Sequence, residues 1–103
     1  MSTTRYGVHR LMDSRYGSSH SLQWLEVNAG HCIGYHPLQE EQASTLWIGG
    51  TVVLSGCDSV PLPLPASCKD LVAALQAVPG DKAWHISSSE WASGKAMALH
   101  LLE

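Results

Sequence analysis

Residues 45–54 have the sequence Thr-Leu-Trp-Ile-Gly-Gly-Thr-Val-Val-Leu, in which two short apolar tracts flank a pair of glycines. Tracts rich in β-branched and aromatic residues favour strands. Glycine tolerates the positive φ angles that tight hairpin turns require. We therefore predict a β-hairpin with Gly49 and Gly50 at its turn, which would complete an antiparallel β-meander ending near Ser55.

The residues before this hairpin predict the other strands of the meander. Residues 6–12 are followed by the polar pair 13–14 and a second extended tract, a pattern typical of a hairpin. Residues 21–27 (SLQWLEV) carry apolar side chains on both faces, as a largely buried strand does. The turn residues 28–30 follow, so residues 31–36 can return as a partner strand.

The second half of the chain contains the clearest helix. Residues 60–65 (VPLPLP) have proline at every second position, which removes backbone donors and predicts an extended crossover. Ser67 then suits an N-cap, and residues 67–78 carry one apolar stripe that Pro79-Gly80 ends. We expect this helix to pack on one face of the sheet.

The last segment has two interpretations. Residues 82–86 (KAWHI) predict a strand. Residues 88–102 suit either a capped helix or a hairpin in which 84–91 pairs with 95–102. Because Gly94 would cost a helix interior about 1 kcal/mol relative to alanine, we favour the hairpin. The whole chain, 1–103, is then one α+β domain: an antiparallel meander of about five or more strands and one helix.

Composition restricts the classes of function. The net charge is −3 and the charged fraction is 15%, so a nucleic-acid binder or an anionic-membrane binder is not expected. The chain has no long apolar run and no signal-peptide pattern, and its three cysteines form no CxxC pair; these features favour a cytoplasmic protein with free thiols. A weakly charged surface also favours self-association, so a homo-oligomer is plausible.

One motif carries a family resemblance. Gly30, His36 and Gly49 have the spacing of Gly-x5-His-x-His-x3-Glu-x6-Gly, and the segment resembles the first motif of the cupin family. Leu38 stands where that motif has its second histidine, and Gln42 stands where it has its glutamate. The resemblance implies an all-β barrel as the alternative fold.

The resemblance also implies an alternative function, that of a degenerate cupin-like protein or enzyme that binds a metal or a sugar. His85 loosely resembles the histidine of the second cupin motif. A divalent metal would then use His36 and His85 with Glu40 or Glu41, since imidazole and carboxylate are common metal ligands. Without this resemblance we expect no metal and no cofactor.

Other side chains suggest further hypotheses. We expect Trp24, Trp47 and Trp84 in the core, whereas Trp91 has small polar neighbours and is predicted to be an exposed contact residue. Cys68, in the first helical turn, suits a thiolate with a lowered pKa. Three arginines near the N-terminus suit an anion contact: Arg5, Arg10 and Arg15.

Hydrolase and nucleotide-binding signatures are missing: the sequence has no Gly-x-Ser-x-Gly, no phosphate-binding Gly-x4-Gly-Lys loop and no Gly-x-Gly-x-x-Gly. We therefore predict a small non-catalytic binding or interaction module for a protein partner or a small ligand. Its predicted contact residues are Tyr35, His36, His85 and Trp91.

Overall fold

The computed structural model describes residues 3–38 and 45–103. Its elements, in chain order, are β1 (Thr4–Asp13), β2 (Ser18–Asn28), β3 (His31–Pro37), β4 (Thr45–Trp47), β5 (Thr51–Ser55), β6 (Ala66–Ser67), α1 (Cys68–Gln76), β7 (Lys82–Ile86), α2 (Ser88–Ser93), β8 (Lys95–Ala96) and β9 (His100–Leu101). The chain therefore combines strands and helices, as predicted.

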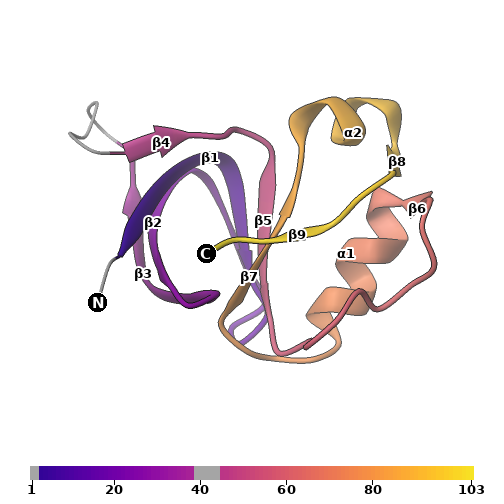
Figure 1. The fold of residues 1–103 in the computed structure, drawn as a ribbon, viewed down its shortest axis with the longest axis horizontal. Helices are drawn as coiled ribbons and strands as arrows, with labels where there is room; N and C mark the ends of the chain where they lie inside the picture. Colours follow the sequence, from indigo (N-terminus) through magenta and orange to yellow (C-terminus); the bar gives the residue numbers. More distant parts are fainter. Residues whose placement is uncertain (1–2, 39–44) are drawn as a thin grey trace.

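The main sheet closes on itself. Its strand order is β2-β3-β7-β5-β1, and β1 also pairs with β2, so five strands form a barrel (Figure 1). The first three strands are the antiparallel meander that the sequence predicts. A closed barrel is compatible with the alternative fold, and it coexists with helices outside the barrel.

The predicted hairpin at Gly49-Gly50 is wrong. Both β4 and β5 run parallel to β1 on the same side of it, with Gly7 opposite Trp47 and Arg10 opposite Thr51. The two glycines therefore lie within one interrupted strand, where they accommodate one additional residue as a bulge does. Both positions need glycine because their φ angles, +65° at Gly49 and +67° at Gly50, are positive. The same tolerance of positive φ led to the prediction of a turn.

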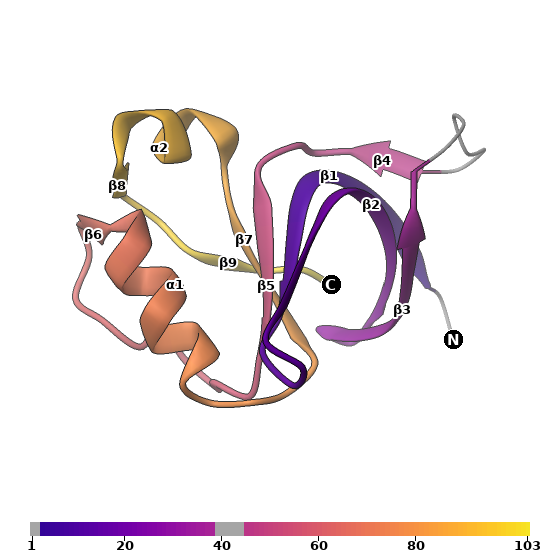
Figure 2. The same ribbon diagram turned by 180° about the vertical axis from the view of Figure 1, so that it is seen from behind.

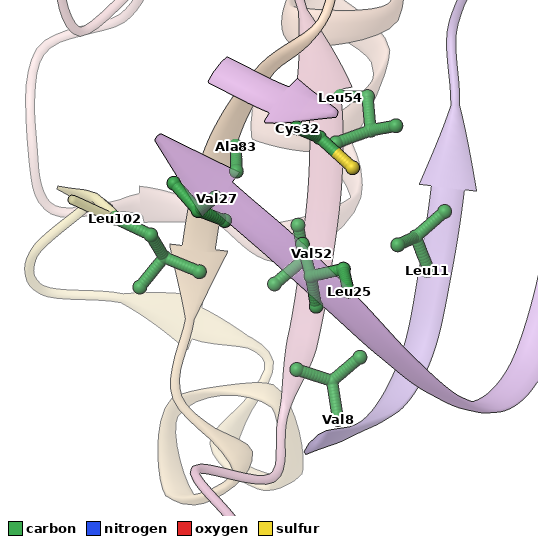
Figure 3. Packing of buried hydrophobic residues seen from close by; sticks show 9 residues of the cluster. All are labelled: Val8, Leu11, Leu25, Val27, Cys32, Val52, Leu54, Ala83 and Leu102. Atoms are coloured by element: carbon green, nitrogen blue, oxygen red, sulfur yellow. The ribbon is translucent and has the colours of Figure 1, made fainter. Parts of the chain in front are cut away.

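Two apolar clusters lie on opposite sides of β5 and β7. The first fills the barrel (Figure 3) and consists of Val8, Leu11, Leu25, Val27, Cys32, Val52, Leu54, Ala83 and Leu102. The second lies between the sheet and α1, and it includes Val53, Leu71, Leu75, Trp84 and Ile86. Strand β5 is buried on both faces for this reason. Figure 2 shows α1 on the side of β5 opposite the barrel.

The helix prediction for residues 67–78 is confirmed with slightly shorter bounds. Ser67 is the N-cap, and its hydroxyl oxygen accepts the amide N–H of Asp70 at 3.0 Å. The predicted crossover lies between β5 and β6 and contains no strand, but repeated bends interrupt it, so it is not one continuous extended segment. None of the helices in the described ranges is long and apolar enough to cross a membrane.

The final segment combines both of its interpretations. His85 pairs with His100, and Trp84 pairs with Leu101, so the two arms come together as the hairpin interpretation required. Residues between the arms instead form the short helix α2, which the favoured interpretation excluded. Gly94 does not weaken that helix, because it ends the helix in the left-handed conformation at φ +80°.

Candidate functional site

The bulge between β4 and β5 is held by its own backbone bonds to β1. The carbonyl oxygen of Gly7 accepts the amides of Ile48 and Gly49 at 3.0 and 3.2 Å. The carbonyl oxygen of Gly50 accepts the amides of His9 and Arg10 at 3.1 and 3.2 Å. These bonds fix the position of the bulge on β1 and leave the Gly49 carbonyl and the Gly50 amide for other partners.

Two histidines bond to the remaining polar groups of the bulge. The amide of Gly50 donates to Nδ1 of His9 at 2.9 Å, so Nδ1 carries no hydrogen and the neutral ring has its N–H at Nε2. His85 Nε2 lies 3.1 Å from the carbonyl oxygen of Gly49. Because a carbonyl only accepts, the hydrogen of the His85 ring lies on Nε2.

The environment of His85 disfavours its charged form. Burial lowers the pKa of His85 below its ordinary value, and the charge of His100 acts in the same direction. The bond to Gly49 and the carboxylate of Glu90 act in the opposite direction but do not compensate. His85 is therefore a neutral residue that supports the bulge.

A small cavity of about 190 Å³ lies beside the bulge, between the barrel and α2. Its lining residues are His9, Arg10, Gly50, Thr51, Ser88 and Trp91. Gly50 and Thr51 form a buried backbone floor, whereas the side chains of His9, Arg10, Ser88 and Trp91 are exposed at its rim. We call this cavity the bulge pocket.

An aromatic row crosses the outer surface of the barrel toward the bulge pocket. His36 on β3 lies opposite Trp24 on β2, with ring centroids 4.8 Å apart. Trp24 lies opposite Gly7, and Gly7 lies opposite Trp47. The ring of Trp47 covers Gly7 and makes an edge contact with His9, with centroids 4.9 Å apart. The aromatic row therefore consists of His36, Trp24, Trp47 and His9.

The core assignments of two tryptophans need correction. Trp47 is 52% exposed, and Trp24 is only partly buried, because both side chains lie on the outer face of the barrel. The apolar patterns of their segments predicted buried side chains, but they could not tell which face of each strand would lie inside the barrel. Trp84 is in the core as predicted, and Trp91 is exposed as predicted at 37%.

Of the four predicted contact residues, the structure brings two together at the bulge and places the other two elsewhere. Trp91 lines the bulge pocket, and His85 bonds to the bulge beneath it. His36 belongs to the far end of the aromatic row. Tyr35 has a different role: its hydroxyl donates to the carboxylate of Asp13 at 3.0 Å, and Asp13 is completely buried.

Asp13 forms a satisfied buried ion pair. Burial opposes ionisation of this carboxyl, but hydrogen bonds from Arg15 and Tyr35 and the charge of Arg15 outweigh it and lower its pKa. The guanidinium Nη2 of Arg15 lies 2.9 Å from Oδ2 of Asp13. Tyr35, Asp13 and Arg15 therefore hold the barrel together where β1 turns into β2.

The structure does not bring His36 and His85 together. His36 follows His31 on β3, and His85 follows Lys82 on β7, and the only pair recorded between these antiparallel strands is His31 with Lys82. The two histidines therefore lie in opposite directions from that pair. Glu40 and Glu41 lie outside the described residues. Within residues 3–38 and 45–103, no group of three or more histidine, cysteine, aspartate or glutamate side chains is arranged to hold a metal.

The thiolate hypothesis for Cys68 is wrong. Its side chain is buried, and this burial raises its pKa, with a further contribution from the charge of Glu90. The helix position that would activate an exposed thiol is outweighed by the loss of hydration. Cys68 is part of the cluster under α1.

The arginine hypothesis now concerns a single residue. Arg5 pairs with Glu26, and Arg15 pairs with Asp13. No ion pair is found for Arg10 among the residues that the structure describes, and Arg10 lines the bulge pocket. One sequence signal bore on this site: the apolar residues Val8 and Leu11, both buried, are separated by two polar residues, so the strand alternation is interrupted at His9 and Arg10.

Comparison with known proteins identified no relative of this chain. No protein-family model matches the chain, and no curated protein or solved structure is similar enough for a relationship to be inferred.

Proposed function

We propose that this protein is a non-catalytic binding module that contacts a protein partner or a small ligand through the aromatic row and the bulge pocket. The observation that supports this proposal most strongly is the exposure of Trp47 and Trp91, at 52% and 37%, on either side of His9 and the bulge. Partly exposed tryptophans contribute strongly to binding interfaces, since each brings a large apolar surface and an N–H donor.

The rigid mounting of these rings also supports a binding role. Trp47 is fixed across Gly7, where an added Cβ would lie 2.8 Å from the ring. His9 is fixed by the Gly50 amide and by Trp47. A preformed surface loses less conformational entropy on binding than a mobile one does.

The test compares ligand screens on the unaltered protein and on Trp47→Ala and Trp91→Ala, with Tyr16→Ala as the control. Tyr16 is an aromatic residue that is 75% exposed in the turn after β1, outside the aromatic row. We expect peptides or small molecules that raise the melting temperature of the unaltered protein and of Tyr16→Ala to lose that effect on the tryptophan variants. Ligands whose effect survives both tryptophan substitutions would contradict the proposal.

A degenerate cupin-like metal or sugar binder is the second candidate, supported by the closed barrel and by the aromatic surface beside a polar pocket. A sugar would require the same tryptophans. A metal would use His36 and His85 with Glu40 or Glu41, and it would have to bridge two histidines that lie in opposite directions from the His31–Lys82 pair. Native mass spectrometry of protein purified without a histidine tag tests the metal directly. One divalent ion per chain, lost in the double variant His36→Ala with His85→Ala, would favour the metal-binding candidate. The same spectrum would also show whether the chain forms homo-oligomers.

A further inference from the structure

We propose that the bulge pocket binds the carboxylate group of its ligand, with Arg10 as the charge partner and Trp91 as the wall against the apolar part of the ligand. This inference rests on the proposed function, because it names the chemical group that one part of the contact surface would recognise. Three features of the described residues support it: the charge of the pocket, its hydrogen-bond donors and its size. Trp91, which lines the pocket and is 37% exposed, supplies the apolar wall.

The first feature is a positive charge without a matching negative one. Arg5 and Arg15 have carboxylate partners, but no ion pair is found for Arg10 in the described part of the chain. Glu90 is the acid of α2, and its carboxylate keeps its charge, but its oxygens are directed to neutral donors. It accepts the hydroxyl of Ser87 at 3.1 Å and the amides of Met97 and Ala98 at 3.1 and 3.0 Å.

The second feature is that the pocket presents donors. Gly50 uses its carbonyl and its amide in bonds to β1, so the floor has no free acceptor at that residue. His9 accepts at Nδ1, which leaves its Nε2–H as a donor. Arg10 contributes guanidinium N–H groups, and Ser88 contributes a hydroxyl. A ligand group that only accepts hydrogen bonds, such as a carboxylate, complements this set.

Size and charge select among anions. The cavity of about 190 Å³ is smaller than the sites of drug-sized ligands, which occupy roughly 300–1,000 Å³. It suits one functional group and a short apolar body, such as an acidic side chain or the carboxyl end of a peptide. One arginine with a neutral histidine matches the single charge of a carboxylate better than the double charge of a phosphate.

The experiment uses phenylacetate as the probe, with phenylacetamide as its neutral isostere and inorganic phosphate as the competing anion. We expect calorimetry and amide chemical shifts to report one phenylacetate per chain, with shifts at Arg10, Gly50, Thr51 and Trp91. Because a charge-assisted hydrogen bond is lost in phenylacetamide, its affinity should be at least about tenfold weaker. Arg10→Gln should remove this preference, and Arg5→Gln, which alters a paired arginine outside the pocket, should keep it.

Each result separates this inference from the proposed function. Equal affinity for phenylacetate and phenylacetamide, or tighter binding of phosphate, would overturn the carboxylate assignment. If phenylacetate and phenylacetamide bound equally well and both lost their binding in Trp91→Ala, the aromatic binding module would remain supported. Absence of binding by all three probes to a folded protein would also overturn the assignment, and the ligand screen on the tryptophan variants would decide the broader proposal independently.

Discussion

Gly50 lies where the bulge presses against the end of β7. A Cβ at this position would overlap the carbonyl oxygen of Ile86 and would lie 3.0 Å from both His85 Nε2 and the amide nitrogen of Ser88. Its φ of +67° adds the cost that side chains experience in the left-handed region. Gly17 shares this backbone conformation, at φ +63°, but an added Cβ would meet nothing within 4 Å.

These two glycines form a matched pair for measuring the packing of the bulge. Gly17→Ala should lower the free energy of unfolding by about 1 kcal/mol, from backbone strain alone. Gly50→Ala should lower it by about 3 kcal/mol, because the overlap with β7 is added to the same strain. Urea denaturation of both variants measures the difference, and equal losses would mean that the bulge is not packed against β7 as described.

His85 makes stability depend on pH through its lowered pKa. The unfolded chain binds a proton at this residue at higher pH than the folded chain does, so stability falls as the pH drops below the ordinary histidine value of about 6.5. His85→Gln retains a donor for Gly49 and does not titrate. Denaturation between pH 7.5 and about 5.5 should therefore show a smaller loss of stability for His85→Gln. Identical pH dependence in both proteins would contradict the lowered pKa.

Helix α1 depends on a local cap that can be tested separately from the core. The hydroxyl of Ser67 accepts the amide of Asp70, and Ser67→Ala leaves that amide without its partner. The loss should be about 1 kcal/mol in the free energy of unfolding. Ser59→Ala, at an exposed serine in the crossover before α1, should change it little. A comparable loss in both variants would argue against a specific capping contribution.

Local sequence signals predicted the elements whose partners are near in the chain. The β1–β2–β3 meander follows from alternation and turn residues, and α1 follows from its cap, its stripe and Pro79-Gly80. The parallel pairing of β1 with β4 and β5 is a long-range contact, and nothing local in residues 45–54 distinguishes it from a hairpin. Glycines at positive φ serve a primed turn and a bulge equally well.

The candidate site was predicted only in part for the same reason. Trp91 was recognised because its neighbours in sequence are small and polar. Arg10 was one of three candidate arginines, and only the structure distinguishes it from Arg5 and Arg15. His9 becomes a functional candidate only when β4 and β5 lie beside β1 and α2 closes the other side. His36 and His85 were linked by their resemblance to two cupin motifs, yet they lie in opposite directions from the His31–Lys82 pair, because such a resemblance does not specify the direction of each strand.

At the scale of the whole molecule, the barrel is completed by residues from the far end of the chain. β7 pairs with β3 only at Lys82, and β9 pairs with β7 beyond that point (Figure 1). Leu102 then enters the barrel core, and its amide donates to the carbonyl oxygen of Ala83 at 2.9 Å. The hydroxyl of Tyr6 on β1 donates to the carbonyl oxygen of Glu103 at 2.7 Å. These contacts join residues 102–103 to β7 and to β1.

Leu102 should therefore behave as a core residue. It is 9% exposed and packs among barrel residues from several strands, so Leu102→Ala removes apolar contacts and leaves a cavity at the seam between β3 and β7. We expect a loss of about 2 kcal/mol or more in the free energy of unfolding. Hydrogen exchange should also become faster at the amides of Cys32 and Ala83. These amides donate across the seam to the carbonyl oxygens of Asp81 and Gly30, respectively. Met97→Ala is the control, since Met97 is an apolar residue of the same segment that is 65% exposed, and its substitution should have little effect. If the two variants were equally stable and exchange at Cys32 and Ala83 were unchanged, the side chain of Leu102 would have no part in holding the seam between β3 and β7.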